Sequence, residues 1–339
     1  MFVVLRPGSG KADLRRVLRR AVGAGCRGRV LADAENPTVA VSGETSKLEP
    51  SGFQVLPGVR EVLAVGRLAP QAPAGRRPAP AVVEVAGGKV RIGGDRFTVI
   101  AGPCVVESEK SLLRIARGVK KAGAHLLRGG AFKPRTSPYC FQGLGEAGLK
   151  ALAAARAETG LPIVTEALDQ RSLELVYEYA DVIQIGARNM QNYALLKEAG
   201  RLAKPIMLKR GISATIDEWL MSAEYLLAEG NSRVILCERG IRTFSGHTRN
   251  TLDLNAVCVA RGLSRLPVIV DPSHGTGVAS AVVPMARAAA ALPSHGIMVE
   301  VHDRPGEALC DGHQALRPAE FADLMRDLAA MSRVCGYRL

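Results

Sequence analysis

The stretch FTVIAGPC, residues 97–104, is an apolar run of strand length that ends in Gly, Pro and Cys. Similar runs recur along the rest of the chain, separated by amphipathic stretches with helical periodicity. Strands that alternate with helices pair in parallel, because a parallel pair needs a crossover connection. Eight such runs favour a closed (β/α)8 TIM barrel, an α/β fold, over an open sheet. The expected strands are 97–101, 125–128, 162–166, 182–186, 205–209, 233–237, 267–270 and 296–301.

Two local signals support this reading of the barrel segment. Thr215 and Glu218 have the spacing of a helix capping box, and Gly230 supplies the stop, which predicts a helix over 215–229. No G-x-G-x-x-G motif follows the first expected strand, which disfavours a dinucleotide-binding fold.

A second, smaller unit is expected ahead of the barrel. Its pattern is β-α-β-β-α-β, the ferredoxin-like order, although the second helix is poorly formed in the sequence. The Pro- and Ala-rich segment QAPAGRRPAPA predicts a linker, and Gly87-Gly88 predicts a β-hairpin over 82–92. We therefore expect a ferredoxin-like domain at 1–70, a linker at 71–81 and the barrel unit at 82–339. The expected elements of the small unit are strands 2–6, 28–31, 38–42 and 59–65 and helices 11–24 and 44–49.

The composition is that of a globular protein, with 339 residues of which 47% are hydrophobic and 23% charged. The apolar stretches are interrupted well before the roughly 18 to 20 residues that a membrane span needs. The N-terminus lacks the pattern of a signal peptide. The seven cysteines include no C-x-x-C pair, which argues against a disulfide framework or a zinc ribbon. We expect a cytoplasmic protein with no membrane partner.

The net charge of +13, from 45 Lys and Arg against 32 Asp and Glu, suits nucleic acid, anionic small molecules or simple solubility. Arg15, Arg16, Arg19 and Arg20 lie at helical spacing in the small unit. Because no aromatic residues are interleaved to stack on bases, this run is better read as a solvated helix face. We expect no nucleic-acid partner.

Each expected strand ends in a charged or nucleophilic residue. In a TIM barrel the chemistry lies at this end of the strands, so these side chains should gather at one mouth. Gathering several cations costs stability through repulsion, unless the ligands are phosphates and a carboxylate. The alternative is that each cation pairs with a neighbouring acid. The cations concerned are Arg128, Lys133, Arg135, Arg188, Lys209, Arg210 and Arg239.

A second set offers one sulfur, one imidazole and two carboxylates: Cys104, His274, Glu300 and Asp311. The first and last strands of a closed barrel are neighbours, so these residues can converge. A mixed set suits a first-row divalent ion that keeps an open position for substrate. Asp271 and His302 would orient ligands or cap helices.

Long strings of this chain resemble the 3-deoxy-D-arabino-heptulosonate 7-phosphate (DAHP) synthase family, from about residue 95 to the end. The family joins phosphoenolpyruvate to erythrose 4-phosphate in the first step of the shikimate pathway. The N-terminal unit is similar to a module of β-type members that serves feedback inhibition by aromatic amino acids. The strings are AGPC (101–104), LRGGAFKPRTSPY (127–139), IQIGARN (183–189), LKRG (208–211), ILCERGIRTF (235–244), VDPSHGTG (270–277) and VEVH (299–302).

The resemblance implies that Cys104, His274, Glu300 and Asp311 ligate a divalent metal, with Mn2+, Co2+, Fe2+ or Zn2+ all plausible. It also implies that Arg128, Lys133 and Lys209 hold the carboxylate side of phosphoenolpyruvate. Arg188 and Arg239 would hold its phosphate, and Arg135 and Thr136 the aldose phosphate. Arg210 and Asp271 complete the expected substrate contacts.

In the mechanism that we expect, the metal is a Lewis acid for the aldehyde, and C3 of phosphoenolpyruvate attacks the aldehyde carbon. Water then adds at C2 and inorganic phosphate leaves. Two further assignments are hypotheses: Glu166 positions the water, and Lys133 gives a proton to the aldehyde oxygen.

Other functions remain open at this point. The sister family that makes 3-deoxy-octulosonate 8-phosphate shares the barrel, but KPRT favours the four-carbon aldose; a sialic-acid-type synthase and a nucleic-acid-binding protein are further alternatives. Gly275 and the string VVES depart from the family pattern without touching an expected ligand. The effector would be tyrosine or phenylalanine, unless the small unit only buries a surface or builds an oligomer interface. A homo-oligomer, either dimer or tetramer, is expected.

Overall fold

The computed structural model describes residues 2–31, 37–43, 48, 51–63 and 81–339. The chain divides into two compact units, residues 1–77 and 78–339. The linker expected at 71–81 lies outside the described residues, apart from Ala81.

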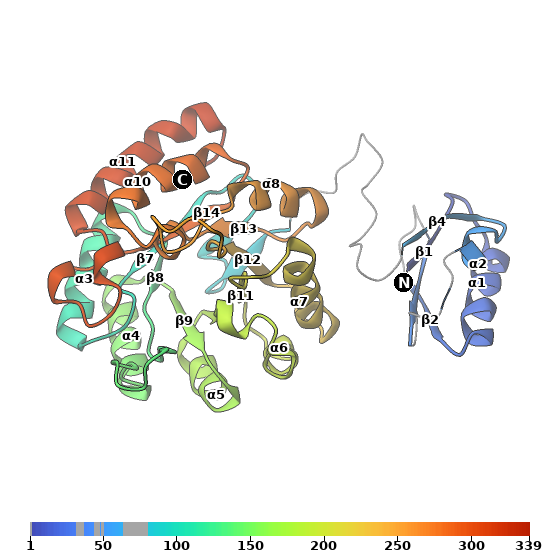
Figure 1. The fold of residues 1–339 in the computed structure, drawn as a ribbon, viewed down its shortest axis with the longest axis horizontal. Coiled ribbons are helices and arrows are strands. Elements are labelled where there is room, and N and C mark those ends of the chain that lie inside the picture. The colour runs from blue at the N-terminus through green and yellow to red at the C-terminus, as the bar shows by residue number, and fades with distance from the viewer. Residues whose placement is uncertain (1, 32–36, 44–47, 49–50, 64–80) are drawn as a thin grey trace. The chain divides into compact units, whose positions relative to one another are not determined.

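The N-terminal unit contains an antiparallel sheet of order β2-β3-β1-β4 and two helices (Figure 1). Val3 and Leu5 of β1 pack with Val17 of α1 and Phe53 of α2 in its core. The ferredoxin-like prediction is confirmed, but α2 forms later than expected and Leu48 is not helical. Residues 44–47, 49, 64 and 65 of the expected elements lie outside the described residues. The elements are β1 Phe2–Leu5, α1 Lys11–Gly23, β2 Arg27–Leu31, β3 Thr38–Ser42, α2 Ser51–Gln54 and β4 Val59–Leu63.

The second unit is a closed barrel of parallel strands, as predicted. The first and last strands close it, with Glu300 of β14 opposite Gly102 of β7. Because these strands are neighbours, segments from both ends of the barrel sequence meet at one place. The strands are β7 Thr98–Gly102, β8 Leu126–Arg128, β9 Ile163–Ala167, β10 Val182–Ile185, β11 Ile206–Lys209, β12 Val234–Glu238, β13 Val268–Val270 and β14 Gly296–Glu300.

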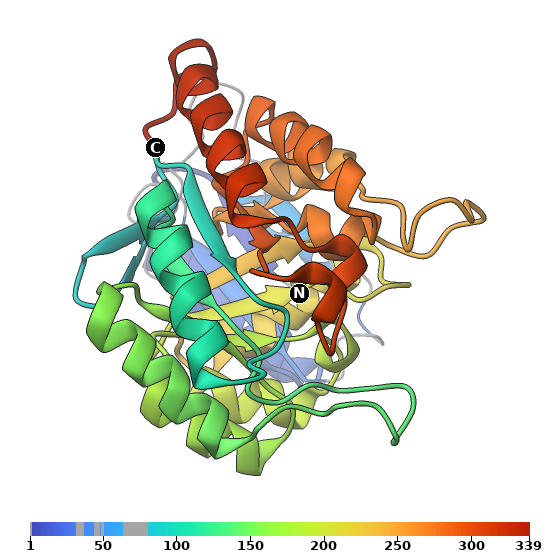
Figure 2. The ribbon, with the colours of Figure 1, turned by 90° about the vertical axis from the view of Figure 1, so that its left-hand side faces the viewer.

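Helices surround the strands, and α11 packs against α3, so the outer ring closes as the sheet does (Figure 2). The helix predicted from Thr215 forms with its capping box: Thr215 Oγ1 accepts from Glu218 N at 3.1 Å, and Thr215 N donates to Glu218 Oε2 at 2.8 Å. The barrel helices are α3 Glu109–Ala122, α4 Glu146–Thr159, α5 Gln170–Tyr179, α6 Tyr193–Gly200, α7 Ile216–Ala228, α8 Leu254–Leu263, α9 Pro272–Thr276, α10 Ala279–Ala291 and α11 Pro318–Cys335.

The predicted hairpin, β5 Val83–Val85 and β6 Val90–Ile92, fills the N-terminal end of the barrel. Its apolar side chains pack against Leu126 and Val182, the first residues of β8 and β10. Burial of these apolar groups closes this end to solvent, so the opposite mouth is left for ligands.

The C-terminal segment returns to the start of the barrel. Phe97 N donates to Arg338 O at 2.8 Å, and the ring of Tyr337 stacks on Phe97 with centroids 4.7 Å apart. Within the described residues, no helix has both the length and the apolar character that crossing a membrane requires.

Candidate active site

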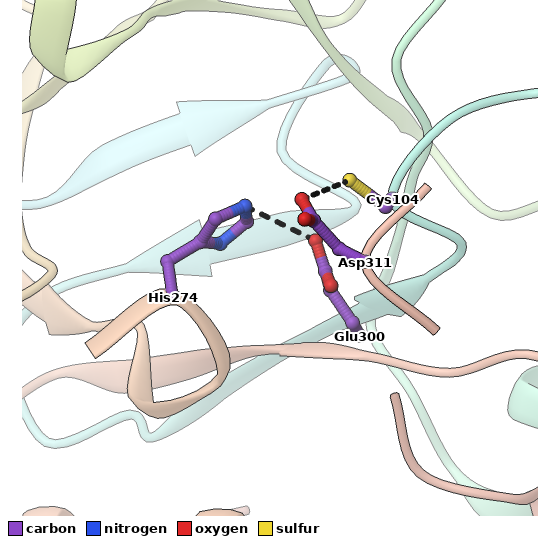
Figure 3. Close-up of side chains that lie close together, drawn as sticks. All are labelled: Cys104, His274, Glu300 and Asp311. Carbon is purple, nitrogen blue, oxygen red and sulfur yellow. Dashed lines mark hydrogen bonds and ion pairs between the residues drawn. The ribbon is translucent and has the colours of Figure 1, made fainter. Parts of the chain in front are cut away.

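Four side chains from distant parts of the chain converge at the barrel mouth (Figure 3). Their ligand atoms all lie within 4.8 Å of one another. Cys104 follows β7, His274 lies in α9 after β13, Glu300 ends β14, and Asp311 lies in the loop that follows. The strand order of a closed barrel predicts that these four residues converge, and the structure brings them together.

His274 is held by Asp271, which caps the short helix α9. One carboxylate oxygen of Asp271 accepts from His274 N at 3.0 Å, and the other lies 2.7 Å from His274 Nδ1. With a proton on Nδ1, Nε2 keeps its lone pair and faces Glu300 Oε1 at 3.1 Å. Burial lowers the pKa of His274 to about 4, so the imidazole is neutral near pH 7, the form that binds metal.

The two carboxylates are kept ionised by basic groups. Glu300 accepts from Arg128 Nη1 and from Gln314 Nε2, both at 2.8 Å. Asp311 accepts from Lys133 Nζ at 3.1 Å. Burial opposes ionisation of both carboxylates, but their cationic neighbours outweigh it and lower both pKa values.

Cys104 lies between a cation and a second thiol. Its Sγ accepts from Lys133 Nζ at 2.7 Å and lies 3.6 Å from the Sγ of Cys310. The contact with Cys310 and burial raise the pKa of the Cys104 thiol well above its ordinary value. A divalent cation beside the sulfur would favour the thiolate instead.

This donor set fits a divalent transition metal. One sulfur, one imidazole nitrogen and two carboxylates match ions such as Mn2+, Co2+, Fe2+ and Zn2+. Partners behind the donors, such as Asp271 and Gln314, fix their orientation as outer groups do in metal sites.

A cavity of about 260 Å3 opens beside the four donors. Among the described residues, neither Arg188 nor Arg239, which both line it, forms an ion pair. Burial also lowers the pKa of Arg239. Two cations that lack carboxylate partners on one cavity wall are suited to an anionic ligand. The predicted residues that line this cavity are Cys104, Arg128, Lys133, Thr136, Glu166, Arg188, Lys209, Arg239 and His274.

Other cations of the predicted set are paired with acids. Arg128 contacts Glu300, and Lys209 Nζ lies 2.5 Å from Asp271 Oδ2. The alternative that each predicted cation pairs with a neighbouring acid therefore holds for some of these cations and not for others.

Three residues expected to contact substrate do not line the cavity. Arg210 is buried and contacts Glu238 and Asp253, each at 3.0 Å, so it joins β12 to the start of α8. Asp271 is fully buried and holds Lys209 and His274. Arg135 Nη1 lies 2.8 Å from Cys310 Sγ, at the edge of the site.

Glu166 faces the cavity from β9. Its Oε2 accepts from Gln184 Nε2 at 2.7 Å, which fixes the carboxylate. Gly186 leaves room for it, because a Cβ at this position would lie 2.0 Å from Glu166 Oε1.

Arg242, Arg249 and Asn250 were not among the residues predicted from the sequence, yet they also line the cavity. They belong to the loop after β12, and a bridge between Ile241 and Thr251 returns this loop to the mouth. The strand-end rule identifies Arg239 but gives no signal for a loop that folds back.

Comparisons with known proteins agree with this geometry. A model described as "DAHP synthetase I family" matches residues 73–333, and one described as "DAHP synthase ferredoxin-like domain" matches residues 1–67. A phospho-2-dehydro-3-deoxyheptonate aldolase of Thermotoga maritima is 45% identical over 339 residues, which is all of both chains. A 2-dehydro-3-deoxyphosphooctonate aldolase of Syntrophotalea carbinolica is 33% identical over 72% of this chain and 94% of that protein.

The solved structures that resemble this chain include two of DAHP synthase from Thermotoga maritima. A crystal structure of the Thermotoga maritima DAHP synthase matches with a TM-score of 0.78 and 44% identity, covering 99% of this chain and 98% of that one. A truncated form of the Thermotoga maritima synthase matches with a TM-score of 0.72 and 46% identity, covering 77% of this chain and 95% of that one.

Proposed function

Because this chain belongs to the DAHP synthase family and has its aldolase activity, which catalyses the first step of the shikimate pathway, we propose the following substrates and cofactor for it. It condenses phosphoenolpyruvate with D-erythrose 4-phosphate and depends on a divalent metal. The observation that carries the proposal is the convergence of four S, N and O donors within 4.8 Å beside a cavity lined by cations. Cys104, His274, Glu300 and Asp311 would hold the metal, which supplies Lewis acidity to the aldehyde oxygen.

Phosphoenolpyruvate fits the cationic wall of the cavity. Its phosphate lies against Arg188 and Arg239, which have no carboxylate partner to displace within the described part of the chain. Its carboxylate is near Arg128, Lys133 and Lys209. Fixing both ends holds C3 toward the incoming aldehyde, so the C–C bond forms from a limited set of orientations.

Lys133 is the proton donor in this proposal. Burial alone would lower its pKa, but the acidic groups around it, Cys104 first and then Glu300 and Asp311, outweigh burial and raise the pKa. The ammonium is therefore charged at neutral pH and can deliver a proton as the aldehyde oxygen becomes a hydroxyl.

Glu166 holds the water that completes the reaction. After C3 bonds to the aldehyde carbon, the water oxygen bonds to C2 and gives up a proton, which replaces the one delivered to the aldehyde oxygen. The bond from C2 to the phosphate oxygen then breaks, the new hydroxyl on C2 loses its proton to the leaving phosphate, and a ketone and inorganic phosphate result. The contact from Gln184 keeps the Glu166 carboxylate at the cavity wall. Arg135 and Thr136 would bind the phosphate of the aldose. Arg210 has a structural role in this proposal, because its guanidinium contacts Glu238 and Asp253.

In the test, the purified enzyme is given phosphoenolpyruvate together with either erythrose 4-phosphate or arabinose 5-phosphate. The consumption of phosphoenolpyruvate is followed over time. We expect loss with the four-carbon aldose only, abolished by chelator and restored by Mn2+. The five-carbon aldose is included because relatives at about one-third identity are named 2-dehydro-3-deoxyphosphooctonate aldolase. No loss with either aldose under any metal would contradict the proposal.

Regulation is a separate part of the proposal. A model named for the ferredoxin-like domain of DAHP synthases matches residues 1–67, which supports feedback inhibition by tyrosine or phenylalanine through this unit. Removing residues 1–77 is therefore expected to abolish inhibition while kcat stays within about twofold of the full chain, since the barrel unit keeps its own core.

The measurement is the initial rate against effector concentration for both chains. Inhibition that persists after the deletion would place the effector site on the barrel. A full chain that neither amino acid inhibits would leave the unit with a structural role, such as the interface of the expected homo-oligomer.

A further inference from the structure

Glu107, a carboxylate outside the group of four donors, contacts the segments that carry two of them and belongs to the segment of a third. We propose that Glu107 is a positioning residue that sets the spacing among Cys104, Glu300 and Asp311. The inference rests on the proposed metal-dependent function. It goes beyond that function because nothing in the sequence pattern or in the likeness to known synthases assigns Glu107 a role.

The first contact reaches the loop that carries Asp311. Leu309 N donates to Glu107 Oε1 at 2.7 Å, and Leu309 lies two residues before Asp311. Glu107 lies three residues after Cys104 on the loop from β7 to α3. One short hydrogen bond therefore joins the neighbourhoods of a sulfur ligand and a carboxylate ligand.

The second contact reaches the end of β14. His302, two residues after Glu300, approaches Glu107 Oε2 through Nε2 at 3.4 Å. Its Nδ1 accepts from Arg304 N at 3.0 Å, so the ring proton is on Nε2 and points toward Glu107. The side chains are 7% exposed for His302 and 15% for Glu107, so water does not readily replace this contact.

The loop from 301 to 317 needs such a support because it is irregular. Two short 3-10 turns, Pro305–Glu307 and Gly312–Gln314, interrupt it before α11, and a bridge between Val301 and Leu316 joins its two ends. Asp311 has φ of 53°, a left-handed conformation that surrounding contacts must maintain. Asp303 is tied to α3 through Ser111 and Arg114, but those contacts do not reach the segment of Cys104.

The test measures the affinity of the full chain for Co2+ by competition with a chromophoric chelator, together with the Co2+–thiolate absorption band. Glu107→Ala loses both contacts, and we expect Co2+ to bind about 10- to 100-fold more weakly, as when other outer partners of metal ligands are lost. Glu107→Gln keeps an acceptor for Leu309 N, so its affinity for Co2+ should lie between those of the unchanged chain and Glu107→Ala. The matched control is Glu109→Gln, an exposed carboxylate two residues along, which should bind Co2+ as the unchanged chain does.

A second variant keeps the test decisive if Glu107→Ala fails to fold. His302→Gln disturbs one of the two contacts and should weaken Co2+ binding by a smaller factor. Where Glu107→Ala does fold, adding His302→Gln to it should cost almost nothing further, because both act through one group. Additive losses would indicate two independent structural effects and would overturn the inference.

The remaining outcomes separate the two proposals. Co2+ binding by Glu107→Ala as tight as in the unchanged chain, with an unaltered thiolate band, would overturn the positioning role alone. An unchanged chain that binds no Co2+ would remove the metal-dependent function and this inference with it.

Discussion

Cys104→Ala is expected to lower metal-stimulated turnover by about 10³-fold or more. The variant removes the one sulfur donor, and it leaves Lys133 without the thiol that lies 2.7 Å from its Nζ. The measurement is the rate of phosphoenolpyruvate loss with erythrose 4-phosphate across a series of Mn2+ concentrations.

Cys258→Ala is the matched control, since this exposed cysteine lies on α8, away from the cavity lining. It should retain the full rate. A Cys104→Ala enzyme that keeps its activity, or an unchanged enzyme that works fully in metal-stripped buffer, would contradict the proposed role of the metal.

Lys133→Ala is expected to lower kcat by about 10²- to 10⁴-fold, the range for loss of a general acid. KM for phosphoenolpyruvate should change much less, because other cations still bind the substrate. Arg128 and Lys209 would hold its carboxylate, and Arg188 and Arg239 its phosphate. Steady-state kinetics with each substrate varied in turn separate the two quantities.

The control is Lys150→Ala, an exposed lysine on α4 whose partner is Glu146. It should match the unchanged enzyme in both kcat and KM. A Lys133 variant whose loss appears in KM alone would show that Lys133 only binds substrate.

The barrel and three of the four candidate donors were predictable from sequence because Cys104, His274 and Glu300 lie at or just after strand ends, whereas Asp311 lies in the loop after the last strand. Apolar runs of strand length mark the strands to within one or two residues, and barrel closure makes the first and last strands neighbours. That is why Cys104 and Glu300, far apart in the chain, were expected together. The pairing of Glu300 with Gly102 realises this expectation.

The prediction for Arg210 did not use the alternation of side chains along a strand. Lys209 points into the barrel, so the next residue points outward. Arg210 accordingly lies against Glu238 and Asp253, while Arg239, which follows Glu238, lines the cavity. Strand periodicity is therefore enough to separate these inward and outward cations.

The other unexpected features depend on loops, where no periodicity applies. Arg249 reaches the site because its loop folds back, and its Nη1 lies 3.2 Å from Gln314 Oε1. Glu107 accepts a hydrogen bond from the main chain of Leu309, and a side-chain type in the sequence cannot reveal a main-chain partner. The second helix of the small unit was weak in the sequence, and α2 has only four residues.

The closing pair of strands also has a consequence for synthesis. Cys104 and Asp311 are 207 residues apart in the chain, and the C-terminal segment pairs with the start of the barrel. On a translating ribosome Cys104 emerges before Glu300 and Asp311. A nascent chain therefore lacks two of the four candidate donors until the last barrel strand and the loop after it have been made, so the proposed metal site cannot form earlier.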